Sequence, residues 1–207
     1  MPMTIRSLPE IQPDALVDAI FPADAQNARL IRDIALVVGF TLLTAMLAQI
    51  KIPLGFTPVP ITGQTLAVML TGAALGSRRG AAAMTLYLLA GAWLPFFAGG
   101  DSGFIWELAS GGYIIGFIPA AYLVGFLSER GWDRRVWIIL AMLLGNIVLY
   151  IPGLIQLSIF VPEANVFEIG LYPFILGDLI KIYLAALILP SAWWLIQWSR
   201  SRSGTWK

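Results

Sequence analysis

Long apolar runs dominate this chain, and one of them, Val136–Phe160, contains no charged residue. A helix of that length can cross the roughly 30 Å hydrocarbon core of a lipid bilayer. Over the whole sequence 58% of the residues are hydrophobic and only 12% are charged, and the mean hydropathy is +0.81. So few polar side chains cannot cover the surface of a soluble domain of this size. The sequence therefore predicts an all-α integral membrane protein.

Six runs are predicted to form transmembrane helices, which together make a membrane domain over residues 33–198. Their limits are Asp33–Ile50, Gly63–Gly76, Ala81–Phe96, Gly111–Leu127, Val136–Phe160 and Leu171–Trp198. At about 1.5 Å per residue the second run is too short to cross a bilayer unaided. The preceding segment, Ile52–Thr62, contains three prolines and favours irregular backbone. Such backbone is tolerated at membrane depth only where it is buried or lines a cavity, so we expect it to form a wall of a binding site.

The distribution of basic residues predicts the orientation in the membrane. Arginines follow the second, fourth and sixth runs, at Arg78, Arg79, Arg130, Arg134, Arg135, Arg200 and Arg202. The positive-inside rule then places both termini in the cytoplasm. We expect the ligand pocket on the external side, beneath the loops Lys51–Thr62 and Pro95–Gly112. Trp193, Trp194, Trp198 and Trp206 are expected in the aromatic belt at the cytoplasmic interface.

Two segments flank the predicted membrane domain. Residues 1–32 are expected to be a cytosolic extension, and residues 199–207 a basic cytosolic tail. Within the extension, apolar residues at helical spacing lie opposite acidic ones, which predicts a short amphipathic helix on a surface. The apolar set is Leu16, Val17, Ile20 and Phe21, and the acidic set is Asp14, Asp18 and Asp24. A tail without regular structure is the alternative.

Composition excludes several classes of function. The chain has no Cys and no His, which rules out disulfides and the usual zinc, haem and Ser–His–Asp sites, so we expect no metal and no cofactor. A net charge of +1 argues against a nucleic acid partner. The sequence also lacks the G-x-x-x-x-G-K-[ST] loop that binds nucleotide phosphates. Any ATP hydrolysis would therefore belong to partner subunits, and we expect this chain not to be an enzyme.

Two charged residues, Asp178 and Lys181, interrupt the otherwise apolar run Leu171–Trp198. Each such charge costs roughly 2.5–3.5 kcal/mol at the centre of a membrane helix, so the pair needs a partner or a ligand. Their i, i+3 spacing places both on one helix face. We interpret them as a polar binding site that can accept from N–H groups and neutralise an anion. A purely structural ion pair is the alternative.

Four motifs in register resemble the biotin-specific S components of energy-coupling-factor (ECF) transporters, the BioY family. They are Pro58-Val-Pro-Ile-Thr-Gly-Gln-Thr-Leu-Ala-Val68, Leu94-Pro-Phe-Phe-Ala-Gly-Gly100, Gly111-Gly-Tyr-Ile-Ile-Gly-Phe117 and Gly177-Asp-Leu-Ile-Lys181. The resemblance covers roughly residues 33–190. It departs from the family pattern at Ala109-Ser110, where Pro-Thr is frequent, at Leu176, where proline is frequent, and at Asp101, which we expect to point into solvent.

The resemblance implies a subunit that captures biotin for uptake across a prokaryotic cytoplasmic membrane. Asp178 would accept the ureido N–H groups or orient Lys181, and Lys181 would pair with the ligand carboxylate or donate to its carbonyl. Tyr113 offers a ring for the bicycle, although an interfacial position is the alternative. Thr62 and Gln64 could bind the ureido group or cap a helix. Gly99 and Gly100 could let backbone N–H groups approach the ligand, or simply make the loop flexible.

The same resemblance implies partners, namely a transmembrane coupling subunit and a pair of ATPases. Close helix contact in lipid needs small residues, and Ala35, Gly39 and Ala45 could provide such a face, with internal packing as the alternative. An S component for thiamine or riboflavin, or a stand-alone vitamin transporter, remains a second hypothesis. An intramembrane enzyme is the third, and the absence of His, Cys and clustered carboxylates argues against it.

Overall fold

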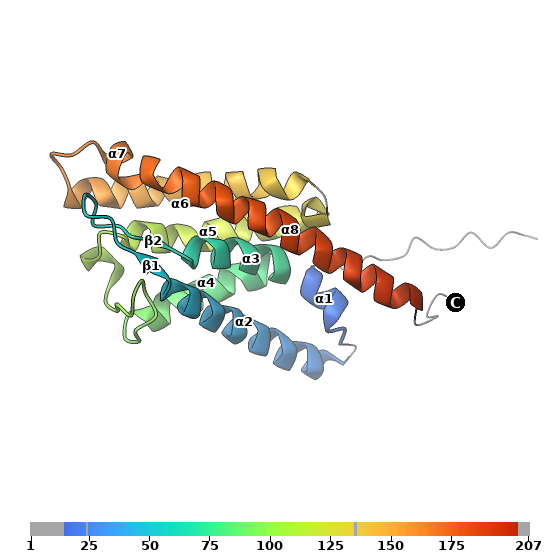
Figure 1. Cartoon of the computed structure of the whole chain (residues 1–207). Helices are drawn as coiled ribbons and strands as arrows, with labels where there is room; N and C mark the ends of the chain where they lie inside the picture. The colour runs from blue at the N-terminus through green and yellow to red at the C-terminus, as the bar shows by residue number, and fades with distance from the viewer. Residues whose placement is uncertain (1–14, 24, 135, 203–207) are drawn as a thin grey trace, which may run out of the picture.

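The protein folds into a bundle of helices, which the computed structural model describes over residues 15–202 apart from 24 and 135 (Figure 1). The helices are α1 (Leu16–Ile20), α2 (Gln26–Ala48), α3 (Gln64–Leu75), α4 (Ser77–Gly91), α5 (Gly111–Ser128), α6 (Trp137–Phe160), α7 (Val166–Gly170) and α8 (Tyr172–Arg202). Two short strands, β1 (Lys51–Ile52) and β2 (Ile61–Thr62), pair antiparallel. Two 3-10 turns cover Ile105–Glu107 and Trp132–Arg134.

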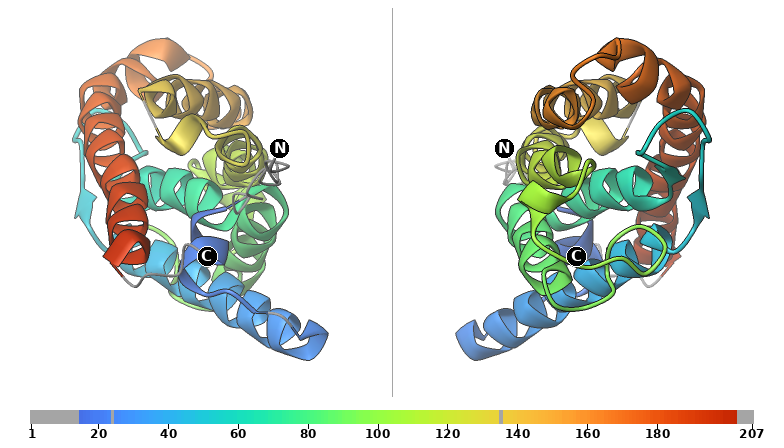
Figure 2. Two further views of the ribbon diagram at one scale, coloured as in Figure 1. Left: turned by 90° about the vertical axis from the view of Figure 1, so that its right-hand side faces the viewer. Right: turned by 90° about the vertical axis from the view of Figure 1, so that its left-hand side faces the viewer.

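The bundle has two distinct ends (Figure 1). The hairpin end carries β1, β2, α7 and the long connection from α4 to α5. The terminal end carries α1, the start of α2 and the last turns of α8. The end-on views of Figure 2 show α3 between α8 on one side and α4 with α5 on the other, and α3 contacts all three. The short helix α3 is therefore an interior element.

The prediction of an all-helical membrane protein is confirmed for most of the chain. Among the described residues, four helical stretches are long and apolar enough to cross a bilayer: Gln26–Ala48, Gly111–Ser128, Trp137–Phe160 and Val166–Ser199. As expected, α3 is too short to do so, with 12 residues. The remaining predicted run is also short, because α4 has 15 residues and its apolar continuation, residues 92–96, is not helical. The small hairpin β1–β2 is an addition to the predicted all-α fold.

Two predicted helix starts were too late. The first helix begins at Gln26 rather than Asp33, and the third begins at Ser77 rather than Ala81. In both cases the early turns of the helix carry charged residues, which ion pairs stabilise in place. Arg79 donates to both carboxylate oxygens of Asp18, at 2.9 and 2.6 Å, and to Asp33 at 3.0 Å.

That cluster also fixes the N-terminal segment against the bundle. Leu16 and Val17 of α1 are buried and contribute to the core, whereas Ile20 and Phe21, which follows the helix, are exposed, so only half of the predicted apolar face is buried. Helix α1 packs against α3 and α8, so it covers the terminal end of the bundle rather than lying apart from it. The acidic residues Asp14 and Asp24 lie outside the described residues, as does the tail from residue 203.

One of the tryptophans predicted for an interfacial belt, Trp193, lies elsewhere. Trp194 and Trp198 are exposed and stack on each other, with ring centroids 6.3 Å apart. Trp193 is buried instead, and its indole N–H donates to the carboxylate of Asp133, which is fully buried in the turn before α6. Trp206 lies outside the described residues.

Helix α5 crosses α3 almost backbone to backbone. A Cβ atom added at Gly125 would lie 2.4 Å from the carbonyl carbon of Gly76, and one added at Gly72 would lie 2.4 Å from the carbonyl oxygen of Ala121. Gly76 itself has a φ of +83°, which ends α3 and turns the chain directly into α4. Small residues at this crossing therefore bring α3, α4 and α5 together as one unit.

The proposed small-residue face on α2 contains only two of its three residues. Ala35 and Gly39 are exposed, but Ala45 is buried in the core. At about 100° per residue, Ala45 is turned by about 80° from Ala35, so the prediction that it shares that face is wrong. The exposed face of α2 continues instead through Val38, Leu42 and Met46.

Candidate functional site

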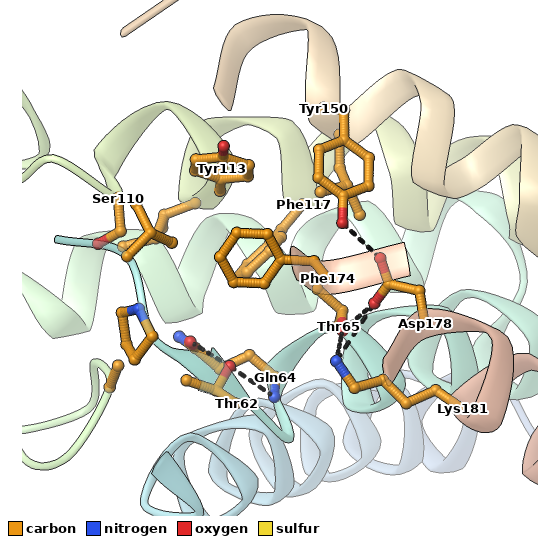
Figure 3. A pocket seen from close by; sticks show the side chains of 15 residues that line it. Thr62, Gln64, Thr65, Ser110, Tyr113, Phe117, Tyr150, Phe174, Asp178 and Lys181 are labelled. Atoms are coloured by element: carbon orange, nitrogen blue, oxygen red, sulfur yellow. Dashed lines mark hydrogen bonds and ion pairs between the residues drawn. The ribbon is translucent and has the colours of Figure 1, made fainter. Parts of the chain in front are cut away.

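A small cavity of about 50 Å³ lies towards the hairpin end, between α3, α5, α6 and α8 (Figure 3). Its walls are Val59, Pro60, Thr62, Gln64, Thr65, Ala98, Ser110, Tyr113, Ile114, Phe117, Leu149, Tyr150, Phe174, Asp178 and Lys181. Sites for drug-sized ligands are usually 300–1,000 Å³, so these walls must separate to admit one. Val59, Pro60 and Ala98 come from irregular segments and are the parts least restrained by helix hydrogen bonds.

The predicted pair, Asp178 and Lys181, lies in this cavity wall on α8. The Lys181 ammonium is 3.2 Å from Asp178 Oδ1, and it also donates to the hydroxyl of Thr65 on α3 at 2.7 Å. The Tyr150 hydroxyl, from α6, donates to the other oxygen of Asp178 (Figure 3). Asp178 is only 6% exposed. Three helices therefore hold one buried charge pair in place, which stabilises both charges away from water.

Aromatic rings form the apolar part of the cavity. Tyr113 and Phe117 come from α5, Tyr150 from α6 and Phe174 from α8 (Figure 3). The rings of Tyr113 and Tyr150 meet edge to face, with centroids 5.9 Å apart. The Tyr113 hydroxyl donates to the carbonyl of Gly170 at 2.7 Å, so it anchors α7 and leaves only the ring for a ligand. Of the two positions considered for Tyr113, the structure shows the one inside the bundle, where its ring lines the cavity.

Thr62 and Gln64 both line the cavity at the start of α3. Thr62 donates to Gln64 Oε1 at 2.9 Å and accepts from the backbone N–H of Gln64 at 3.3 Å. The amide nitrogen of Gln64 donates to the Tyr87 hydroxyl at 2.6 Å, and Tyr87 donates in turn to the carbonyl of Phe96. The two residues therefore both organise the helix start and present oxygen atoms to the cavity.

Gly99 and Gly100 lie outside the cavity lining. Their φ values of +73° and +86° confirm that the loop needs glycine here. Their N–H groups donate within the protein, from Gly99 to the carbonyl of Ala48 and from Gly100 to that of Phe97. These glycines shape the loop that brings Ala98 to the cavity. Asp101 is 61% exposed and lies 3.5 Å from Lys51, as expected for a residue that points into solvent.

Sequence reasoning missed Thr65, Tyr150 and Phe174. Tyr150 carries a hydroxyl inside the uncharged run Val136–Phe160, and a polar group in such a run indicates a buried hydrogen bond. Its partner, Asp178 on α8, is distant in sequence and could not be identified from the pattern. Thr65 stands next to Gln64, inside the first of the four family motifs.

Comparison with known proteins identifies the family. The sequence profile of the BioY family matches residues 19–198. The chain belongs to the BioY family. A biotin transporter BioY of Rhizobium etli is 39% identical over 170 residues, which cover 76% of this chain and 90% of that protein. The biotin transporter BioY of Thermotoga maritima is 37% identical over 152 residues, with 72% and 88% covered.

A solved structure shows the same fold. The crystal structure of the S-component for biotin from an ECF-type ABC transporter superimposes with a TM-score of 0.71 at 28% sequence identity. The match covers 82% of this chain and 94% of that one. The predicted family membership is therefore confirmed, and the fold of this multi-pass membrane protein is that of an S component.

Proposed function

We propose that this BioY-family chain captures biotin and delivers it through an ECF-type transporter as its S component. It is a binding subunit and not an enzyme. The observation that carries the proposal is the buried Asp178–Lys181 pair, which lies against an aromatic cavity in a fold shared with an S component for biotin.

The chemistry of the cavity suits the parts of biotin. The apolar bicycle would lie among the rings of Tyr113, Phe117 and Phe174. Asp178 has two oxygens with about four acceptor positions, of which Tyr150, Lys181 and Thr65 use three. One acceptor therefore remains for a ureido N–H. Lys181 would neutralise the carboxylate or donate to the ureido carbonyl, and the oxygens of Thr62 and Gln64 would bind the remaining polar atoms.

We further propose six membrane crossings, with both termini in the cytoplasm and the hairpin end outside. In this arrangement α3 and α4 cross with the help of their adjoining loops, since each alone is short. Arg78, Arg79, Arg130 and Arg134 would all lie at the cytoplasmic, terminal end. Residues 33–198 would form the substrate-binding domain, flanked by the cytosolic segments 1–32 and 199–207.

The partners would be a transmembrane coupling subunit and a pair of ATPases. The exposed face of α2 around Ala35 and Gly39 is the candidate contact surface, because small residues allow close helix approach in lipid. The remaining apolar surface of the bundle would contact lipid.

Calorimetric titration of the detergent-solubilised protein tests the proposal. Biotin should bind with one-to-one stoichiometry, and thiamine and riboflavin should bind more weakly or not at all. Tighter binding of either of those vitamins would refute the assignment to biotin while leaving the S-component fold in place.

A further inference from the structure

A second, much smaller chamber lies on the other side of the Asp178–Lys181 pair. It has a volume of about 10 Å³, which is about the space that one water molecule requires. Six of the residues that line it are Thr65, Met69, Met142, Asn146, Asp178 and Lys181. Because Thr65, Asp178 and Lys181 also line the larger cavity, these three side chains form the wall between the two spaces.

Asn146 brings an unpaired acceptor into this chamber. It lies on α6, is only 8% exposed, and its Oδ1 atom has no hydrogen-bond partner among the described residues. A buried polar atom without a partner costs about 1–3 kcal/mol, so such an atom in a chamber that is also lined by Thr65, Asp178 and Lys181 indicates a ligand.

Lys181 contributes a matching donor. An ammonium group carries three N–H donors. Within the described part of the chain, Lys181 donates to Thr65 Oγ1 and Asp178 Oδ1, which leaves one donor. The same small chamber is thus lined by a residue with a spare donor and by a residue with a spare acceptor. A water molecule can accept from the first and donate to the second, whereas a metal cation would be repelled by the ammonium.

We propose that Asn146 is a positioning residue, which holds Lys181 at the floor of the larger cavity through one buried water. The water fixes the third donor of the ammonium from below, while Thr65 and Asp178 fix the other two. All three donors are then used within the protein, so Lys181 meets a ligand in the larger cavity through its positive charge, held in one position, which favours the ligand carboxylate over the ureido carbonyl as its partner. The expected effect on biotin rests on the proposed function, but the link between Asn146 and Lys181 does not.

A double-mutant cycle on the free protein tests the link. Asn146→Val removes the acceptor with little change in volume, and Lys181→Met removes the ammonium. Asn146→Val should lower the thermal midpoint by about 2–6 °C in the wild-type background, because the ammonium loses its water. In the Lys181→Met background Asn146→Val should leave the midpoint unchanged or raise it. Asn146 then has no ammonium to hold, and the change only removes a buried polar atom that lacks a partner. Equal lowering in both backgrounds would mean that Asn146 only packs, and would overturn the proposal.

Biotin titration gives the second measurement. Asn146→Val should weaken biotin binding about five- to tenfold, and Asn146→Ser, which keeps an oxygen acceptor, should recover most of the loss. Unchanged affinity in Asn146→Val would overturn the positioning role. Failure of the wild-type protein to bind biotin would instead refute the proposed function, and the thermal cycle would still decide the role of Asn146.

Discussion

At the residue scale, the proposed biotin site rests on the charge pair of Asp178 and Lys181, in which each charge is stabilised by the other. Changing Lys181 to Met keeps the length of the side chain and removes its charge. Asp178 then remains buried without its cation, and biotin binding should weaken at least about tenfold, equivalent to ~1.4 kcal/mol. Calorimetry on the purified variant measures this. An unchanged dissociation constant would reduce the pair to a structural contact.

Tyr150 is the residue that ties this pair to α6. Tyr150→Phe removes only the hydroxyl that donates to Asp178, so one oxygen of a buried carboxylate loses its partner. Biotin binding should weaken roughly five- to tenfold, as expected for a hydrogen bond to a charged group. Tyr183 on the same helix as Asp178 is exposed, so Tyr183→Phe is the matched control and should bind normally. Equal behaviour of the two variants would argue against a role for Tyr150.

Asp133 should make stability depend on pH. Burial raises the pKa of its carboxyl to about 6, although the hydrogen bond from Trp193 acts in the opposite direction. The folded protein therefore holds the proton more tightly than the unfolded chain does, and the free energy of unfolding falls as pH rises from about 4 to 6. Above that range the loss is complete. Asp133→Asn keeps an acceptor for Trp193, so it should be more stable than wild type at pH 7.5 by up to ~2–3 kcal/mol.

Thermal melts of both proteins in detergent at pH 5 and pH 7.5 measure this difference. The gap between variant and wild type should widen at the higher pH. Parallel shifts at the two pH values would show that the pKa of Asp133 is not raised in the folded protein.

Sequence alone predicted the two charges that line the cavity and missed the residues that hold them. Asp178 and Lys181 could be predicted because charges inside an apolar run are costly unless they pair with each other or bind a ligand. Tyr150 and Thr65 could not, because their roles depend on which faces of α6 and α3 meet α8. The prediction for Ala45 was wrong for a related reason. Over the ten residues from Ala35 to Ala45 the helix turns the side chain away from the starting face, and the prediction did not take this rotation into account.

At the element scale, the crossing of α3 and α5 depends on the absence of side chains. Gly125→Ala would place a methyl group 2.4 Å from the backbone of Gly76, and neither backbone can move without separating the helices. We expect a loss of ~3 kcal/mol or more in stability. The matched control is Gly39→Ala on α2, where an added Cβ meets nothing within 4 Å. That change should be neutral or stabilise by up to ~1 kcal/mol, because alanine favours helix.

Fluorescence-detected size exclusion after heating compares the two variants directly. Opposite effects are expected, and similar melting of both would contradict the tight crossing.

The helix order could be predicted from apolar runs, but the early starts of α2 and α4 could not. Their first turns carry charges that look like loop residues until the contacts of Arg79 with Asp18 and Asp33 are seen.

At the scale of the whole molecule, the proposed orientation can be read by chemical labelling. The chain contains no native Cys, so single cysteines report cleanly. Ser102, at the hairpin end, and Ser201, near the end of α8, are both exposed. An impermeant thiol reagent added to intact cells should label Ser102→Cys, and should label Ser201→Cys only after the membrane is permeabilised. The reverse pattern would invert the topology.

The length of α8 has a consequence for the path of the substrate. With 31 residues this helix is about 46 Å long, and Asp178 lies only about 10 Å from its first residue. In the proposed orientation, with the hairpin end outside, a ligand held by the pair would have entered only part of the roughly 30 Å barrier. Beyond it lie Met69, Met142 and Ile182, which are all buried. In that orientation the bundle would be a cup closed towards the cytoplasm and not a tunnel, and a bound ligand would reach the far side only if the bundle itself moved or opened.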